Sequence, residues 1–232
     1  DDALKKALEI AALCNNAVYI NGSLSGKPCL NRAVPEAQEV YANGRTKAFE
    51  SKLMRRAKAP AEKFEFAGDP TERALLAASA KAGITPGSLA GSYFRIDEIP
   101  FDSDRKCMSV VCDNQKGETF VFTKGAPDIL LKKCAKIYDC GREKPLSQQQ
   151  RLSILRKNDE MAGEALRVIA VAYKKLDSRI YNKGGLETGL IFTGLIGMID
   201  PPRKEAAEAV LKCRMAGIKP VMITGDHKLT AV

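Results

Sequence analysis

A short apolar run that ends abruptly at Thr224-Gly225-Asp226 constrains this chain more than any other feature. The β-branched and apolar residues of 221–223 lead directly into it, which is typical of a buried strand. A strand that stops at a glycine and leaves a hydroxyl and a carboxylate at its carboxyl end is a common way to build a phosphate or metal site in an α/β fold. Thr224, Gly225 and Asp226 are therefore candidate site residues.

Composition narrows the class of protein. The chain has 232 residues, of which 45% are hydrophobic and 28% charged, so it can form a sizeable core as one large domain or one domain plus part of another. The formal net charge of +9 fits a solvated lysine-rich surface, nucleic acid, an anionic membrane surface or a small polyanion. Aromatic residues make up only 6% and do not alternate with the basic runs, which argues against nucleic acid.

Cysteine and histidine usage argues against a metal centre. The seven cysteines include no C-x-x-C pair, so we expect no metal site and predict reduced, mostly buried thiols. His227 is the only histidine, and its place just after Thr-Gly-Asp argues against a serine-hydrolase triad.

The longest apolar stretch, 189–199, has about half of the roughly 20 residues that a membrane helix needs. We expect a soluble piece whose membrane part, if one exists, lies elsewhere.

The first half of the chain predicts helices and antiparallel strands. Asp69 is a candidate N-cap with Pro70 at the first helical position, and Glu72 is placed to complete a capping box. Residues 22–63 are the least informative, and a solvated helix or loop is favoured for the basic stretch 45–59. The other predicted elements are a helix at 4–14, a strand at 15–21, a helix from 70 to 81, and strands at 95–101, 107–113 and 119–124, the last two joined by a turn.

In the second half of the chain, Asp200-Pro201-Pro202 separates two groups of predicted helices and strands. Before it we predict a short helix at 127–134, a helix from Ser147 to about 162, and buried strands at 166–173 and 190–199. The two prolines lack N–H groups and fix φ, which suits a stiff connector. A helix at 203–215 and a strand at 218–223 follow, as in an α/β unit. We therefore predict two domains, 1–198 and 199–232.

Several polar or flat side chains follow the predicted strands. Phe101 offers a flat face for a base, although a phenylalanine at a strand end also fits a core position. Lys106 fits either a ligand or a solvated charge. Lys124 ends a strand, and Gly125 allows close backbone approach to a ligand, yet both also fit an ordinary strand-to-helix turn. Arg167 is unusual in a buried strand, because a buried arginine needs an anionic partner, either a carboxylate or a phosphate.

Five segments together carry a family resemblance. They are GDPTE (68–72), FDSDRK (101–106), KGAPD (124–128), DPPR (200–203) and MITGDHKLTA (222–231). In this order they resemble the P-type cation-transporting ATPases, most of all the calcium-pump branch. The resemblance implies an α+β nucleotide-binding domain, an antiparallel sheet flanked by helices, followed by a fragment of an α/β phosphorylation domain. It also implies that the chain is the cytoplasmic portion of an integral membrane protein.

The resemblance assigns roles to residues. It implies that Phe101 stacks on adenine, that Lys106, Lys124 and Gly125 line the nucleotide pocket, and that Arg167 reaches the phosphates. Glu72 would face the adenine site, which competes with its capping role. The remaining implied positions are Asp200 and Arg203 at the hinge side of the cleft, and Thr224, Gly225 and Asp226 at the terminal phosphate and its Mg²⁺.

Two departures from the family pattern set the expected activity. The Asp-Lys-Thr-Gly-Thr motif with the phosphorylated aspartate is absent, as is the later Gly-Asp-Gly-x-Asn-Asp motif. Ser103 also stands where calcium pumps usually carry an arginine. We expect a segment of a larger pump that binds ATP or ADP without turnover, with Mg²⁺ held mainly by other parts of the pump. Its partners would be the phosphorylation, actuator and membrane domains. A stand-alone nucleotide hydrolase and a non-catalytic interaction domain remain as alternatives.

Overall fold

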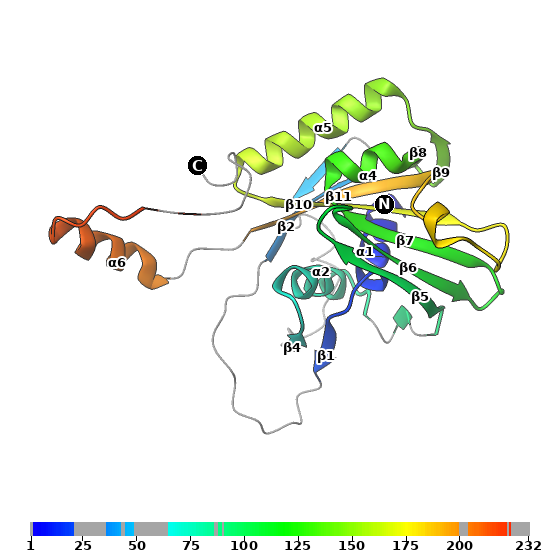
Figure 1. The fold of residues 1–232 in the computed structure, drawn as a ribbon, viewed down its shortest axis with the longest axis horizontal. Coiled ribbons are helices and arrows are strands. Elements are labelled where there is room, and N and C mark those ends of the chain that lie inside the picture. The colour runs from blue at the N-terminus through cyan, green and yellow to red at the C-terminus, as the bar shows by residue number, and fades with distance from the viewer. Residues whose placement is uncertain are drawn as a thin grey trace.

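A large sheet covered by helices on both faces forms the body of the protein (Figure 1). The computed structural model describes residues 2–20, 36–42, 45–48, 65–85, 88–89, 91–199, 204–221 and 223. The helices are α1 (Asp2–Leu13), α2 (Pro70–Lys81), α4 (Pro127–Lys133), α5 (Gln148–Gly163) and α6 (Lys204–Met215). The strands are β1 (Val18–Ile20), β2 (Glu36–Ala42), β3 (Arg45–Ala48), β4 (Glu65–Ala67), β5 (Tyr93–Asp102), β6 (Cys107–Asn114), β7 (Thr119–Gly125), β8 (Cys134–Asp139), β9 (Arg142–Pro145), β10 (Arg167–Lys175) and β11 (Leu190–Ile199).

The sheet is antiparallel along its main path. Its strand order is β3-β2-β11-β10-β7-β6-β5, and β8 joins β11 in parallel while β9 pairs with β8. β1 and β4 form a separate two-stranded sheet. The predicted antiparallel α+β domain is therefore confirmed, including the pairing of 107–113 with 119–124.

One edge of the sheet was not predicted. β2 pairs with β11, and β3 pairs with β2, so the helix or loop favoured at the start of the basic stretch is wrong for residues 45–48. Its remainder, 49–59, lies outside the described residues. Short basic strands are common at sheet edges, where lysine and arginine discourage pairing with another chain. This edge could not be predicted from the local sequence, because β11, the strand that pairs with β2, lies more than 140 residues away in sequence.

Side chains that alternate between the two faces of the central strands divide the hydrophobic core into two layers. Val171 and Tyr173 of β10 join a cluster with α1 and α2, whereas Ala170 and Ala172 join a cluster with α4 and α5. This follows from the two-residue period of a strand, which sends neighbouring side chains to opposite faces. Figure 1 shows the same arrangement, with α1 and α2 below the sheet and α4 and α5 above it.

The predicted helix starts are confirmed by their caps. The Asp69 carboxylate accepts hydrogen bonds from the backbone N–H groups of Thr71 at 2.9 Å and Glu72 at 3.4 Å. Ser147 and Gln150 form a reciprocal capping box at the start of α5. Such caps satisfy N–H groups that have no partner within the helix.

The predicted buried thiols are confirmed at four positions. Cys14, Cys107, Cys112 and Cys134 are buried, and the six described cysteines are all free. Burial raises the pKa of Cys14 and Cys134 to about 12 and that of Cys107 and Cys112 to about 11. These groups are therefore neutral core thiols near neutral pH.

The last described segment differs from the body. Helix α6 confirms the predicted helix, but residues 218–221 and 223 do not form the predicted strand. Val221 is 75% exposed and Ile223 is 93% exposed. A strand requires a neighbour that takes its backbone hydrogen bonds, and no described strand pairs with these residues. Among the described helices, none combines the length and apolar character needed to cross a membrane.

We predict a large difference in backbone protection between these two parts of the chain. In a hydrogen-exchange experiment on monomeric protein, the amides of Val168 to Val171 should exchange slowly, because all four residues pair with β11 and Ala170 and Val171 also pair with β7. The amides of Val221 and Ile223 should exchange near the unprotected rate. Equal protection of the two segments would contradict this expectation.

Candidate functional site

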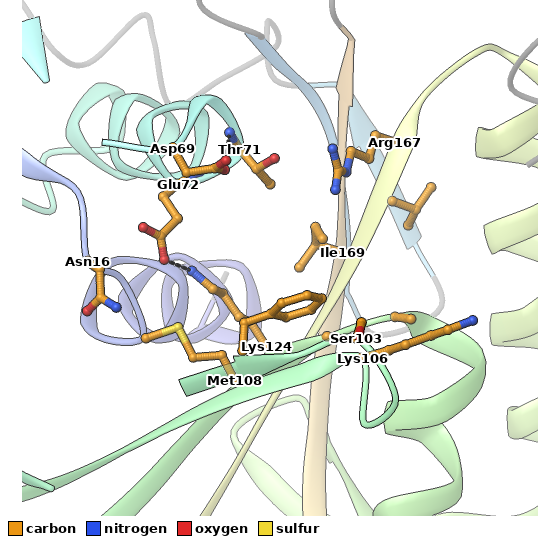
Figure 2. Close-up of a pocket in the computed structure, with 14 residues that line it drawn as sticks. Asn16, Asp69, Thr71, Glu72, Ser103, Lys106, Met108, Lys124, Arg167 and Ile169 are labelled. Atoms are coloured by element: carbon orange, nitrogen blue, oxygen red, sulfur yellow. Dashed lines mark hydrogen bonds and ion pairs between the residues drawn. The ribbon is translucent and has the colours of Figure 1, made fainter. Parts of the chain in front are cut away.

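A cavity of about 640 Å³ opens beside the ends of several strands. Its volume lies in the range of small-molecule sites. Its walls come from segments far apart in sequence: Asn16, Asp69, Thr71, Glu72, Phe101, Ser103, Lys106, Met108, Lys124, Gly125, Ala126, Arg167, Val168 and Ile169. Figure 2 shows how the labelled members of this set surround the space.

Antiparallel pairing explains why these segments meet. The end of β7 lies beside the beginning of β6, with Gly125 opposite Cys107. The same end lies beside the first half of β10, with Lys124 opposite Val171. Strands that run in opposite directions bring one strand's end to its neighbour's start. The first residues of α2 lie beside these strand ends and line the same cavity.

The cavity gathers six of the predicted site residues and leaves five untested. The six that line it are Glu72, Phe101, Lys106, Lys124, Gly125 and Arg167. The five others, Asp200, Arg203, Thr224, Gly225 and Asp226, lie outside the described residues. Sequence reasoning missed other wall residues, chiefly Asn16, Met108, Val168 and Ile169. Their side chains carry no motif, and only their place in the sheet or after α1 brings them to the cavity.

Phe101 is a surface side chain at the end of β5. It is 64% exposed, so the core alternative considered from the sequence is wrong. Met108, which is 2% exposed, and the partly buried Val168 and Ile169 give the cavity an apolar side. An exposed aromatic ring beside an apolar surface is the arrangement that a flat heteroaromatic ligand requires.

Glu72 and Lys124 form an ion pair inside the cavity. The Lys124 ammonium donates to the Glu72 carboxylate at 2.6 Å, and the two side chains are only 10% and 15% exposed, respectively. Figure 2 marks this contact. The predicted capping-box role of Glu72 is therefore wrong, and Asp69 caps the helix by itself. A buried ammonium needs such a partner, so an anionic ligand at Lys124 shares it with Glu72.

Arg167 is exposed rather than buried, which corrects the expectation drawn from its apolar neighbours in sequence. It is the first residue of β10, where the strand leaves the core, so it needs no buried carboxylate. In Figure 2 its guanidinium is directed towards the side of the cavity formed by Thr71. Neither Arg167 nor the exposed Lys106 makes an ion pair with another described residue. No described carboxylate therefore competes with an anionic ligand for either cation.

Gly125 is required by two neighbours where β6 begins, Lys106 and Cys107. A Cβ atom at this position would lie 2.7 Å from the Lys106 carbonyl oxygen and 2.7 Å from the Cys107 Cβ. The next residue, Ala126, donates its N–H to the same carbonyl at 2.9 Å. The structure thus supports the strand-to-helix turn that the sequence left as an alternative, and this tight contact shapes the cavity wall.

The described part of the cavity does not fit a Mg²⁺ ion. Its two carboxylates are engaged, Asp69 with backbone N–H groups and Glu72 with Lys124. Among the described residues no group of three or more histidine, cysteine, aspartate or glutamate side chains could hold a metal ion. One flat ring, an apolar side and two cations that form no ion pair within the described part of the chain instead fit an aromatic organic anion.

Comparison of this sequence with known proteins identifies a protein family. Residues 48–205 match the family model described as "P-type ATPase, cytoplasmic domain N". The chain is 43% identical over 165 residues to a calcium-transporting ATPase of Bacillus subtilis, and 45% identical over 164 residues to calcium-transporting ATPase 1 of Bacillus cereus. Each match covers 71% of this chain and 18% of the relative.

A longer match covers nearly the whole chain. The sodium/potassium-transporting ATPase subunit alpha of Tetronarce californica is 33% identical over 233 residues, which covers 96% of this chain and 20% of that subunit. The chain therefore spans about a fifth of the length of the relatives that it matches.

We predict that Gly125→Ala destabilises the fold and distorts the cavity wall. Overpacking of this kind costs about 1–3 kcal/mol, and chemical denaturation would measure it. Gly163→Ala is the matched control, because a Cβ on this last residue of α5 meets no atom within 4 Å. Its stability should stay equal or rise slightly. An equal loss in both variants would show that local contact at Gly125 is not the cause.

Proposed function

Because this chain belongs to the P-type cation-transporting ATPases, we propose that its cavity binds the adenine nucleotide used by such a pump. The observation that carries the proposal is the convergence of the GDPTE, FDSDRK and KGAPD segments and Arg167 on one cavity. These parts are separated by up to 98 residues in sequence, from Asp69 to Arg167. In the fold, residues of all of these segments line the same space.

Each wall suits one part of a nucleotide. We propose that Phe101 stacks on adenine while Met108 and Ile169 provide apolar contact near the base. Lys124 and Arg167 would bind phosphate oxygens, and Lys106 would line the entrance. Phosphoryl transfer relies mainly on positioning and on neutralising charge, and these cations provide both.

The wider role belongs to the whole pump. We propose that ATP bound here phosphorylates an aspartate in an adjoining domain, and that the aspartyl-phosphate cycle drives a cation across a membrane. Calcium is favoured by the names of the Bacillus relatives. Residues 1–198 would form the nucleotide-binding domain and 199–232 the hinge and part of the phosphorylation domain. The partners would be the phosphorylation, actuator and membrane domains, with this domain on the cytoplasmic side.

Residues of the second region would complete the site. We propose that Asp200 and Arg203 lie at the hinge side of the cleft. Thr224, Gly225 and Asp226 would face the terminal phosphate and its Mg²⁺. Carboxylate oxygens suit that ion, and Asp226 is the one carboxylate in that group.

We predict that Phe101→Ala weakens ATP and ADP binding equally, because stacking on adenine is independent of the number of phosphates. The loss should be about 1–3 kcal/mol, measured by calorimetric titration. Phe94→Ala is the control, since Phe94 lies on the same strand and is 54% exposed but does not line the cavity. Wild-type protein that binds no nucleotide would instead support a non-catalytic interaction domain.

We also predict that the isolated chain releases no phosphate from ATP beyond background. It contains no Asp-Lys-Thr-Gly-Thr segment, and the two carboxylates of the described cavity are engaged, Asp69 with backbone N–H groups and Glu72 with Lys124. A phosphate-release assay over many turnovers measures this. Sustained release that Phe101→Ala abolishes would favour the stand-alone hydrolase.

A further inference from the structure

A buried carboxylate lies behind the cavity wall without lining the cavity. Glu187 is only 5% exposed and stands just before β11. It is absent from the residues around the cavity. A buried charge of this kind is costly unless it is paired and hydrogen-bonded, so its contacts indicate its purpose.

Both oxygens of Glu187 are fully used. Oε1 accepts from the Arg105 guanidinium and from the Ser109 hydroxyl at 2.9 Å. Oε2 accepts from the Lys133 ammonium at 3.1 Å and from the Cys107 thiol at 3.3 Å. Burial alone would raise the pKa of Glu187, but these hydrogen bonds, led by that of Arg105, hold the pKa at about 2. The carboxylate therefore stays charged throughout the neutral range.

Arg105 connects this carboxylate to the cavity wall. Its guanidinium also donates to the Pro100 carbonyl, so one side chain holds both Glu187 and the strand just before Phe101. The turn itself is closed by Asp102, whose carboxylate accepts from the backbone N–H of Arg105 at 2.8 Å and of Asp104 at 2.9 Å.

The turn contains a conformation that needs external support. Lys106 has a φ of 49°, in the left-handed region that non-glycine residues rarely adopt. Its N–H donates to the Asp102 carbonyl at 2.7 Å, and its own carbonyl accepts from Ala126 at 2.9 Å. Strained residues persist only where the surroundings hold them in place. Phe101, Ser103 and Lys106 of the cavity wall all belong to this turn or flank it.

We propose that Glu187 is a positioning residue for the nucleotide site and that it acts through Arg105. It holds the 101–106 turn so that Phe101 and Lys106 face the cavity. The consequence for nucleotide binding rests on the proposed function, whereas the consequence for the turn does not. Lys133 provides the contrast, because it contacts the same carboxylate from the last turn of α4, and no hydrogen bond or ion pair joins it to the described residues of the turn.

The test compares Glu187→Gln with Lys133→Met in the full chain. Two quantities are measured, ATP affinity and the hydrogen-exchange rates of the Asp104, Arg105 and Lys106 amides. Glu187→Gln should weaken ATP binding about five- to tenfold, a partial loss of the stacking contribution, and should accelerate exchange in the turn. Lys133→Met should leave both quantities near the wild-type values even if it lowers the melting temperature.

A third variant separates positioning from general destabilisation. In a Phe101→Ala background, Glu187→Gln should lose most of its effect on ATP affinity, because two residues that act through one wall are not additive. Additive losses would overturn the proposal. So would unchanged affinity and exchange in Glu187→Gln, or equal effects of Glu187→Gln and Lys133→Met.

Two outcomes distinguish this inference from the proposed function. If wild-type protein binds no ATP but Glu187→Gln alone accelerates exchange in the turn, the proposed function fails and the positioning of the turn stands. If Glu187→Gln does not fold, Arg105→Lys tests the same link, because a lysine cannot hold Glu187 and the Pro100 carbonyl together. Unchanged ATP affinity and unchanged exchange in Arg105→Lys would overturn the inference.

Discussion

The antiparallel register of β7 with its two neighbours is the constraint on which the site depends. With Gly125 opposite Cys107 on one side and Ala170 on the other, the end of β7 is placed between the start of β6 and the start of β10. A shift of one residue would send Lys124 to the opposite face. The same register leaves no room for a side chain at 125. The close approach of Gly125 to Lys106 and Cys107 therefore fixes both the strand packing and the shape of this cavity wall.

Two carboxylates then organise the charges around this edge in different ways. Glu72 pairs with Lys124 inside the cavity, where a ligand can reach both. Glu187 is enclosed behind the wall and has all its acceptor positions filled. At the first, the Lys124 ammonium can contact an anionic ligand beside Glu72, whereas the second is suited to hold structure in place. Burial decides which role each carboxylate has, because a fully satisfied buried charge is expensive to disturb.

The lining of the cavity and the family to which the chain belongs are the two supports for the proposed function. A flat exposed ring, an apolar side and cations free of described partners suit recognition of a nucleotide, and the described residues offer no metal cluster. The chain matches about a fifth of the length of its relatives, and the proposed phosphorylation and transport require other parts of such a pump.

The sequence by itself determined the helices and the strands β1, β5, β6, β7, β10 and β11, and the family resemblance pointed to six residues of the cavity. Caps at Asp69 and Ser147 and the two-residue alternation of the strands are local signals, and the motif segments carried the resemblance. Tertiary structure alone decided the β2–β3 edge, the exposure of Arg167, the pairing of Glu72 with Lys124, and the place of Glu187. These depend on contacts between residues tens of positions apart. No local pattern encodes such contacts, because the register of the folded sheet creates them.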